Sequence, residues 1–343
     1  MSPGHNLPAN LLNPAVGGGE TSNIRLFSLG RNALVAGLRL TRLAPGDKVL
    51  LPEFVCRDLL ASIHAAEAVP HFYPVDRALT PILPLPATKA GAILAVNYFG
   101  FPQTLDPFRE FCTRHGACLI EDNAHGFLSS DTLGNPLGSR GDFGIVSMRK
   151  TLATPDGAAL LLNRKEWADR LPAPLPCRND ALPTGFVVRR ALRRFQNATG
   201  VHVRNWSEQA ARHARRLATG HAFPAPLPES ERDIPGKPAI HCRSLGELRG
   251  IDAAAEVERR RGLYLRFEER LRPLGIEPLF AGLAPGVTPF GYPFRAGDLV
   301  AARATRLAQE DGFDCAPWPD LPDAVLPTAP DFYRNVWCVN FLW

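Results

Sequence analysis

Apolar and polar positions follow two different periods along the first half of the chain. Short, nearly continuous apolar runs have the length of strands, and the segments between them place apolar residues at helical spacing. The apolar runs lie at 48–52, 69–76, 91–99, 117–122, 143–148 and 158–163, and the helical patterns at 33–43, 57–68 and 105–116. Buried strands that alternate with helices indicate an α/β fold, with a mostly parallel central sheet covered by helices on both faces.

The second half of the chain has a different pattern. Residues 164–235 combine proline-rich connections with basic helical stretches, 244–275 predicts one long amphipathic helix, and 296–313 predicts another helix among short strands. We therefore expect three parts: a flexible N-terminal arm at 1–23, a large domain at 24–235, and a small C-terminal α+β domain at 236–343. Within the large domain, 164–235 is expected to be an irregular, basic, proline-rich insertion or linker.

The composition is that of an ordinary globular chain. It has 343 residues, of which 45% are hydrophobic and 21% charged, and a formal net charge of +5. Because charges of both signs are scattered, this mild excess does not indicate a nucleic-acid partner. No apolar run approaches transmembrane length, and the first twenty residues lack the basic-then-apolar order of a signal peptide. We expect no membrane partner.

The cysteines indicate the cellular environment of the protein. There are seven, an odd number, and they form no CxxC pair. Nothing in their spacing resembles a disulfide framework or a zinc ligand set. The sequence therefore predicts a reducing, cytoplasmic environment and no metal site.

The stretch "CLIEDNAHGF" (118–127) contains the first candidate chemistry. A strand-like apolar run ends there in Glu121 and Asp122, with His125 three residues after Asp122. Ligands of parallel sheets bind beyond the carboxyl ends of the strands, and a buried charge is costly unless a partner meets it. Asp122 is therefore either a strand end that reaches solvent or a carboxylate held for a charged partner. For Glu121 we favour a structural role, such as accepting nearby N–H groups.

Two further motifs help to decide between these two roles of Asp122. In "SLGRNAL" (28–34) a glycine turn opens a helix, whose free N–H groups suit a phosphate, although most such helices bind nothing. In "SMRK" (147–150) a strand ends, and Lys150 follows Ser147 by three positions. A strand-end aspartate and a lysine beyond another strand suggest pyridoxal phosphate, because an amine can form a Schiff base with its aldehyde and a carboxylate can pair with its pyridinium nitrogen.

Longer matches make the resemblance specific. They run through "FSLGRNAL", "LAPGDKVLLPEF", "VPHFYPVD", "VNYFGFPQ", "LIEDNAHGFLSS" and "GSRGDFGIVSMRKTLATPDGAALLL", and fade beyond about residue 165. The chain resembles the DegT/DnrJ/EryC1/StrS family of pyridoxal-phosphate-dependent aminotransferases, most of which act on nucleotide-linked keto sugars. The resemblance implies the PLP-dependent transferase fold type I and a homodimer with shared active sites.

The resemblance also implies roles for individual residues. Lys150 would form the Schiff base and act as general acid and base, Asp122 would pair with the pyridinium nitrogen, and His125 would contact the ring hydroxyl or its neighbourhood. The phosphate and the ring face would be held by a second set. That set comprises Gly30, Arg31 and Asn32 through backbone N–H groups, Ser147 through its hydroxyl, and Phe54, with Cys56 as a competitor, stacking on the ring.

Three departures from the family pattern are visible. Ser147 and Lys150 are closer together than in the family, and "DGAA" stands where the family has Gly-Gly. The "GxNxR" element, whose asparagine reaches the partner subunit's phosphate, is not recognisable at 225–245. Asn179, Asn197 and Asn205 are substitutes among which the sequence does not choose.

The sequence predicts an enzyme that moves an amino group from glutamate or glutamine to a keto sugar, in polysaccharide or secondary-metabolite biosynthesis. A PLP enzyme acting on a non-sugar ketone or an amino acid is the first alternative. A non-catalytic binding or regulatory descendant is the second, with the basic segment 189–216 as its contact surface. That segment is either a positive rim that attracts an anion or a solvated helix face.

Overall fold

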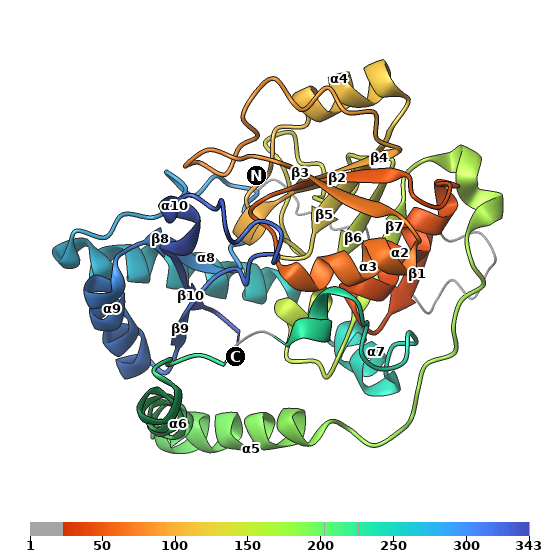
Figure 1. Cartoon of the computed structure of the whole chain (residues 1–343). Coiled ribbons are helices and arrows are strands. Elements are labelled where there is room, and N and C mark those ends of the chain that lie inside the picture. Colours follow the sequence, from red (N-terminus) through yellow and green to blue (C-terminus); the bar gives the residue numbers. More distant parts are fainter. Residues whose placement is uncertain (1–22, 202, 225–226, 343) are drawn as a thin grey trace.

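The computed structural model describes residues 23–201, 203–224 and 227–342, and its largest element is a seven-stranded sheet (Figure 1). The strand order is β1-β7-β6-β5-β4-β2-β3. Strands β2 to β6 pair in parallel, whereas β7 runs antiparallel to both β6 and β1. The strands are β1 (Ile24–Phe27), β2 (Lys48–Pro52), β3 (Val69–Tyr73), β4 (Ala92–Val96), β5 (Cys118–Asn123), β6 (Phe143–Val146) and β7 (Ala158–Leu162).

Helices cover both faces of this sheet, as the alternating pattern predicts. Helices α2 (Gly30–Leu40) and α3 (Leu60–Ala65) lie on one face, and α4 (Asp106–His115) lies on the other (Figure 1). Helix α4 ends on Gly116 in the left-handed conformation (φ 66°), which glycine adopts without steric cost. The prediction of an α/β fold with a mostly parallel sheet is therefore confirmed.

A second, smaller sheet stands beside the first. It has the order β8-β10-β9, all antiparallel, with β8 (Gly291–Arg295), β9 (Asp314–Pro317) and β10 (Val336–Asn340). Its helices are α8 (Ala253–Leu271), α9 (Asp298–Glu310) and α10 (Asp331–Arg334). The single helix predicted at 244–275 is wrong: α7 (Cys242–Arg249) ends before Gly250, and Asp252 starts α8 by accepting a hydrogen bond from the N–H of Ala255 at 3.0 Å.

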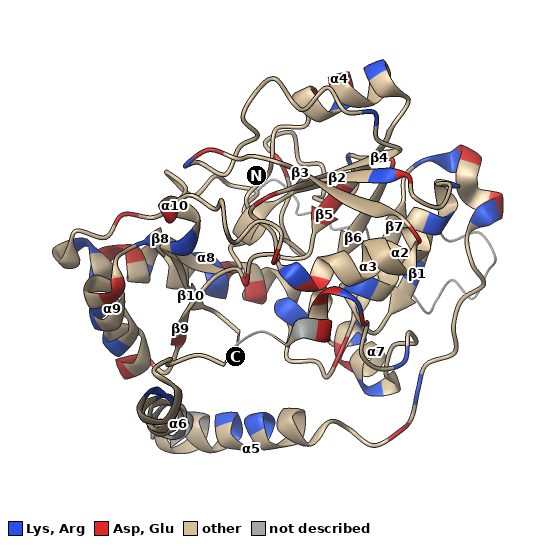
Figure 2. Ribbon diagram, viewed as in Figure 1, with Lys and Arg blue, Asp and Glu red and all other residues tan. Residues whose placement is uncertain are grey.

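The basic segment forms two helices that lie away from the large sheet. Helix α5 (Thr184–Thr199) and helix α6 (Val203–Thr219) follow the proline-rich connection, and Figure 2 marks basic residues in blue along the ribbon of α5. Arg190 of α5 pairs with Glu247 of α7 at 2.9 Å, and Arg212 of α6 pairs with Asp314 of β9 at 2.6 Å. The two helices therefore connect α7 with the small sheet.

Short 3-10 turns complete the described chain, at η1 (Arg57–Leu59), η2 (Tyr98–Gly100), η3 (Met148–Lys150), η4 (Lys165–Arg170), η5 (Pro228–Glu231) and η6 (Arg272–Leu274).

One cysteine prediction is wrong. Cys177 and Cys242 form a disulfide, although 65 positions separate them in the sequence. Backbone hydrogen bonds bring them together, because Arg178 donates to the carbonyl of Ile240 and accepts from the N–H of Cys242. The other five cysteines are free.

Among the described residues, no helix is long and apolar enough to cross a membrane. The cytoplasmic location stays a prediction.

The expected division of the chain also stays a prediction. The arm at 1–23 lies outside the described residues except for Asn23, as do the side chains of Asn197 and Asn205. The two sheets correspond to the two expected domains. Helix α7, on the C-terminal side of the expected boundary, nevertheless packs on the large sheet, because Leu248 shares a hydrophobic cluster with Val146 and Leu161.

Arg260 of α8 joins the small part of the molecule to the lysine-bearing loop. Its side chain is fully buried and donates to the carboxylate of Glu256 at 2.6 Å. It also donates to the carbonyls of Phe290 at 2.9 Å and Thr151 at 2.8 Å. Thr151 directly follows Lys150, so this buried cation fixes the position of the loop.

We predict that Arg260→Met lowers the free energy of unfolding by about 3 kcal/mol or more, because it leaves the carbonyls of Phe290 and Thr151 without this buried donor. Urea denaturation of the purified protein measures this change. Arg303→Gln, at an exposed arginine of α9, is the matched control and should shift stability by less than about 0.5 kcal/mol. Equal stability of the Arg260 variant and the wild type would contradict the assigned role.

Candidate active site

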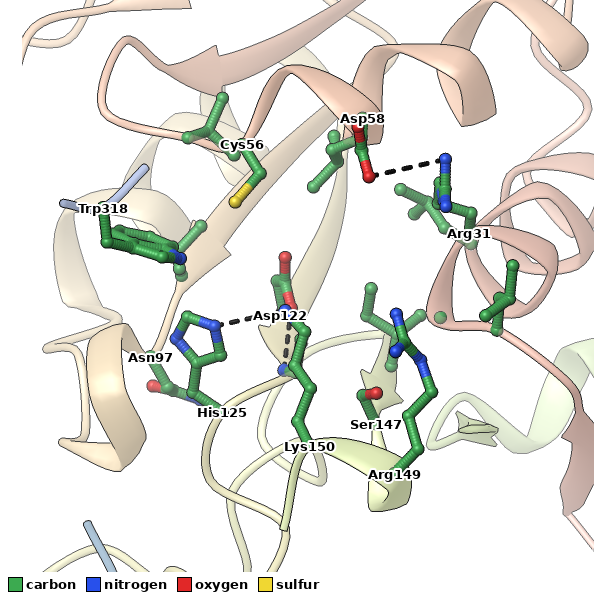
Figure 3. A pocket seen from close by; sticks show the side chains of 18 residues that line it. Arg31, Cys56, Asp58, Asn97, Asp122, His125, Ser147, Arg149, Lys150 and Trp318 are labelled. Carbon is green, nitrogen blue, oxygen red and sulfur yellow. Dashed lines mark hydrogen bonds and ion pairs between the residues drawn. The ribbon is translucent and has the colours of Figure 1, made fainter. Parts of the chain in front are cut away.

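The candidate site is a pocket beyond the carboxyl ends of β4, β5 and β6. Figure 3 shows the side chains of Asp122, near the end of β5, of His125 just after that strand, and of Ser147 and Lys150 after β6, all facing the same cavity. The first turn of α2, the segment after β2 and Trp318 from the small part close the remaining sides. The register explains the convergence, because Asp122 lies opposite Ile145 and Val96 in the two neighbouring parallel strands.

Glu121 and Asp122 are adjacent but have separate roles, because successive strand residues point to opposite faces of a sheet. Glu121 is fully buried and accepts hydrogen bonds from Asn97 at 2.8 Å and from the backbone N–H of Arg140 at 2.7 Å. The guanidinium of Arg140 also pairs with it, at 2.6 Å. The structural interpretation of Glu121 is confirmed.

Asp122 faces the pocket with few partners. Its side chain is 6% exposed and accepts one hydrogen bond, at 2.9 Å, from the N–H of Ala124. Among the described residues, no cation lies within ion-pair distance of its carboxylate. Burial raises the pKa of Asp122, and the more distant charge of Lys150 only partly opposes that shift. This carboxylate is suited to meet a cation brought by a ligand.

The hydrogen bonds of His125 determine the protonation of Lys150. The backbone N–H of Phe99 donates to Nδ1 of His125 at 3.3 Å, so the proton of the neutral ring lies on Nε2. Nε2 is 3.2 Å from Nζ of Lys150 and donates its proton toward Nζ. The lysine nitrogen can accept this hydrogen bond only as an unprotonated amine. Burial lowers the pKa of Lys150 and also lowers the pKa of His125 well below its usual value. The amine is therefore held in its nucleophilic form.

Aromatic rings hold His125 in place. Its imidazole stacks on Phe290, with ring centroids 4.5 Å apart, and Trp318 meets it edge-on at 5.1 Å. The ring of Phe99 lies 5.6 Å away. His125 thus has little freedom to rotate, and its Nε2 stays directed at the lysine.

The other end of the pocket is positive. Helix α2 begins after Leu29, which has no side chain able to cap it, so the N–H groups of Gly30 and Arg31 face the cavity uncapped. The guanidinium groups of Arg31 and Arg149 and the hydroxyl of Ser147 line the same end (Figure 3). This donor set fits an anion such as a phosphate.

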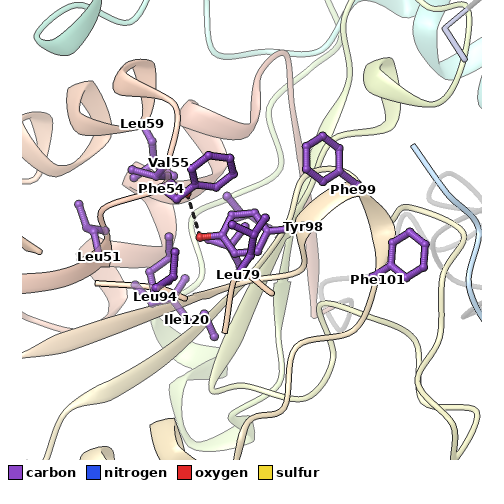
Figure 4. Close-up of a cluster of buried hydrophobic side chains, with 14 of the residues drawn as sticks. Leu51, Phe54, Val55, Leu59, Leu79, Leu94, Tyr98, Phe99, Phe101 and Ile120 are labelled. Carbon is purple, nitrogen blue, oxygen red and sulfur yellow. Dashed lines mark hydrogen bonds between the residues drawn. The ribbon is translucent and has the colours of Figure 1, made fainter. Parts of the chain in front are cut away.

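Two expected ligands lie elsewhere. Asn32 uses its N–H for the carbonyl of Leu29 at 3.0 Å and its side chain for Ser28 at 3.1 Å, and it lines a different groove behind α2. Phe54 is fully buried in the hydrophobic core, packed against Tyr98 (Figure 4). Neither residue lines the pocket, so neither takes the expected place.

Cys56, the competitor of Phe54, does line the pocket. Its thiol lies in buried surroundings, and burial raises its pKa to about 12, so it stays protonated at neutral pH. The segment after β2 turns between these two positions, which places Phe54 inward and Cys56 toward the cavity. A strand-turn geometry of this kind leaves no periodic signal in the sequence.

Sequence reasoning missed Arg149, Asp58 and Trp318, which all line the pocket. Arg149 directly precedes the predicted Lys150, so its position in the sequence could have identified it as a pocket residue. Asp58 lies in the segment after β2, where the turn sets side-chain direction. Trp318 reaches the cavity from a segment far along the chain, and only the packing of the small part on the large one brings it there.

The site therefore combines a carboxylate, an unprotonated amine and a positive end around one cavity. Such a set fits a flat ligand that carries a cationic ring nitrogen, a carbonyl carbon and a phosphate. The fit is chemical as well as geometric, because among the described residues the buried Asp122 has no cation and the Nε of Arg149 has no hydrogen-bond partner.

Comparisons with known proteins agree with this arrangement. Residues 26–182 match the model of the DegT/DnrJ/EryC1/StrS aminotransferase family. A dTDP-4-dehydro-2,3,6-trideoxy-D-glucose 4-aminotransferase of Saccharopolyspora spinosa is 33% identical over 162 residues. This match covers 45% of the chain and 41% of that relative, so the chain spans less than half the length of the curated protein it matches.

Solved structures extend the likeness to the whole fold. The aminotransferase TlmJ from Streptoalloteichus hindustanus superposes with a TM-score of 0.61 at 21% identity, covering 96% of this chain and 83% of that one. The GDP-4-keto-6-deoxy-D-mannose-3-dehydratase of E. coli, solved with bound hydrated PLP, has a TM-score of 0.55 at 14% identity, with 92% and 82% covered. At these identities the likeness establishes the fold, which is the expected PLP-dependent transferase fold type I.

We predict that Asp122→Asn raises the stability of the ligand-free protein at pH 7 by about 1 kcal/mol, because a neutral amide replaces a carboxylate whose charge is poorly solvated. Folding raises the pKa of Asp122, so the wild type becomes less stable as pH rises from the usual aspartate pKa through the raised one. The amide of the variant does not titrate. The difference between the two proteins should therefore shrink toward low pH. Thermal unfolding between pH 4 and 8 measures it.

A stability difference that stays constant over this pH range would contradict a raised pKa for Asp122. Asp106→Asn, at an exposed aspartate of α4, provides the control.

Proposed function

The chain belongs, over residues 26–182, to the DegT/DnrJ/EryC1/StrS aminotransferase family, and from its site we propose that it is a pyridoxal-phosphate-dependent aminotransferase. The observation that supports this most is the placement of Lys150 and Asp122 around one cavity. An unprotonated buried amine and a buried carboxylate without a cation are costly to keep. They are explained together by one ligand that uses both.

When bound, pyridoxal phosphate supplies a reactive aldehyde and a ring that accepts electrons from the substrate carbon. Lys150 would hold the cofactor through its amine and would serve as the base that moves a proton at the substrate carbon. His125 holds Nζ of Lys150 through Nε2, a contact that favours the unprotonated amine. Burial lowers the pKa of both groups, which also favours the neutral amine.

Asp122 lines the same cavity as Lys150. Its carboxylate would hold a protonated ring nitrogen of the cofactor. The N–H of Ala124 fixes one carboxylate oxygen at 2.9 Å and leaves the other directed toward the cavity. Trp318 covers one side of the pocket and limits water around the reacting groups.

For the substrates, we propose glutamate or glutamine as amino donor and a nucleotide-linked keto sugar as acceptor. The name of the matched relative from Saccharopolyspora spinosa supports a keto sugar attached to a nucleotide. The basic end of the pocket suits the phosphate of the proposed cofactor. A homodimer, which the family resemblance implies, and a cytoplasmic location complete the proposal.

We predict that Lys150→Ala abolishes the visible absorbance of the PLP-loaded protein and lowers amino transfer by at least about a thousandfold, because no other amine lies in the pocket. Absorbance spectra and the release of 2-oxoglutarate from labelled glutamate measure the two effects. Lys89→Ala, at an exposed lysine, is the control and should behave as the wild type.

A wild-type protein that stays colourless with saturating PLP would refute the cofactor assignment. Loss of label from glutamate without its appearance in any keto sugar acceptor would refute transfer to that class while leaving the cofactor in place.

A further inference from the structure

We propose that the side chains of Arg149 and Arg31 bind the phosphate monoester of the cofactor, as a two-arginine clamp contributed by a single chain. The proposal rests on the proposed function for the identity of the ligand. It adds two guanidinium groups to a site for which the sequence indicated only backbone N–H groups and the hydroxyl of Ser147. Four features of the described residues carry it.

The first feature is the lack of a partner for Arg149. Its Nε is buried and makes no hydrogen bond, and no carboxylate within the described ranges lies at ion-pair distance from its guanidinium. Burial lowers the pKa of Arg149, and the nearby charge of Arg31 lowers it further. A partly desolvated guanidinium beside a second cation is destabilising, and an anion bound between the two would relieve that cost.

The second feature is the position of Arg31. It lies in the first turn of α2, and its side chain is 17% exposed and lines the pocket. Its one ionic partner is Asp58, at 3.5 Å, whose side chain is 51% exposed. A loose pair of this kind contributes little, so Arg31 retains most of its capacity to bind a further anion.

The third feature is Ser147, which lies between the two arginines and the strand end (Figure 3). The residue is 2% exposed and lines the pocket, and its hydroxyl has no hydrogen-bond partner among the described residues. The hydroxyl is therefore free to donate a hydrogen bond into the cavity. Together with the uncapped N–H groups of Gly30 and Arg31, it points to an oxyanion at this end.

The fourth feature is the rigidity of the arrangement. The N–H of Arg149 donates to the carbonyl of Gly157 at 3.2 Å, and the N–H of Gly157 donates to the carbonyl of Ser28 at 2.8 Å. Gly157 has φ +134°, a conformation that side chains disfavour. The turn that carries Arg149 is therefore tied to the residues just before α2, and the two arginines are held at one end of the cavity before any ligand binds.

The short spacing between Ser147 and Lys150 explains how Arg149 reaches this place. The 3-10 turn η3 (Met148–Lys150) follows Ser147 directly, so three consecutive residues leave the strand end as one tight turn. Met148 is fully buried, whereas Arg149 and Lys150 both line the pocket. The turn thus directs the amine and the guanidinium into one cavity.

A phosphate group could come from the cofactor or from a nucleotide-linked substrate, and the chemistry of recognition is the same. The experiment therefore measures the affinity of the cofactor-free protein for pyridoxal 5'-phosphate and for pyridoxal, which lacks the phosphate. The proteins are the wild type, Arg149→Gln, Arg149→Lys and Arg194→Gln, the last at an exposed arginine of α5. A further arm measures UDP binding to the PLP-loaded wild type and Arg149→Gln.

We expect Arg149→Gln to weaken binding of pyridoxal 5'-phosphate by about ten- to a hundredfold, the range for loss of a charge-assisted contact, and to leave pyridoxal unchanged. Arg149→Lys, which keeps the charge, should restore part of the preference for the phosphate form. Arg194→Gln should equal the wild type. The ratio of the two affinities is independent of turnover and separates phosphate recognition from a general loss of folding.

Equal weakening of both ligands by Arg149→Gln, or no change in either, would overturn the proposal while leaving the aminotransferase function intact. Unchanged cofactor affinity together with weaker UDP binding would assign the arginine to the substrate and would also overturn it. A wild type that binds neither pyridoxal compound would instead refute the proposed function, and the clamp with it.

Discussion

The site depends on ionisable groups that the fold removes from water without supplying all their partners. Asp122 receives one backbone N–H, and Lys150 is held by a neutral histidine rather than by a carboxylate. Such groups reduce the stability of the folded chain, by an amount that the packing around them must offset. The two sheets and the buried Arg260 provide that packing, since they fix the strand ends and the loop after Lys150.

The architecture makes this convergence possible. Parallel strands end at the same edge of a sheet, so residues far apart in the sequence meet there without any long-range signal between them. The N-terminus of α2 opens at this edge and contributes a positive end, and the small part of the molecule closes the cavity with Trp318. Each group is therefore carried by a regular element or by a turn tied to one.

Sequence reasoning gave the fold class, the strands and the pair Asp122 and Lys150, because buried strands leave apolar runs and their ends are easily located. It did not register that the segment after β2 turns Phe54 into the core, or that the first turn of α2 directs Asn32 to the groove behind the helix. The long helix at 244–275 was split by a cap at Asp252 that periodicity does not register. The pairing of Cys177 with Cys242 depends on a local backbone ladder that the cysteine spacing does not reveal.

The most direct measurement is peptide mapping by mass spectrometry after the protein has been incubated with pyridoxal phosphate and reduced with borohydride, which makes the bond between amine and cofactor permanent. The account predicts one modified peptide, with the pyridoxyl group on Lys150, at close to one per chain. Modification spread over several lysines, or found on a lysine other than Lys150, would contradict it.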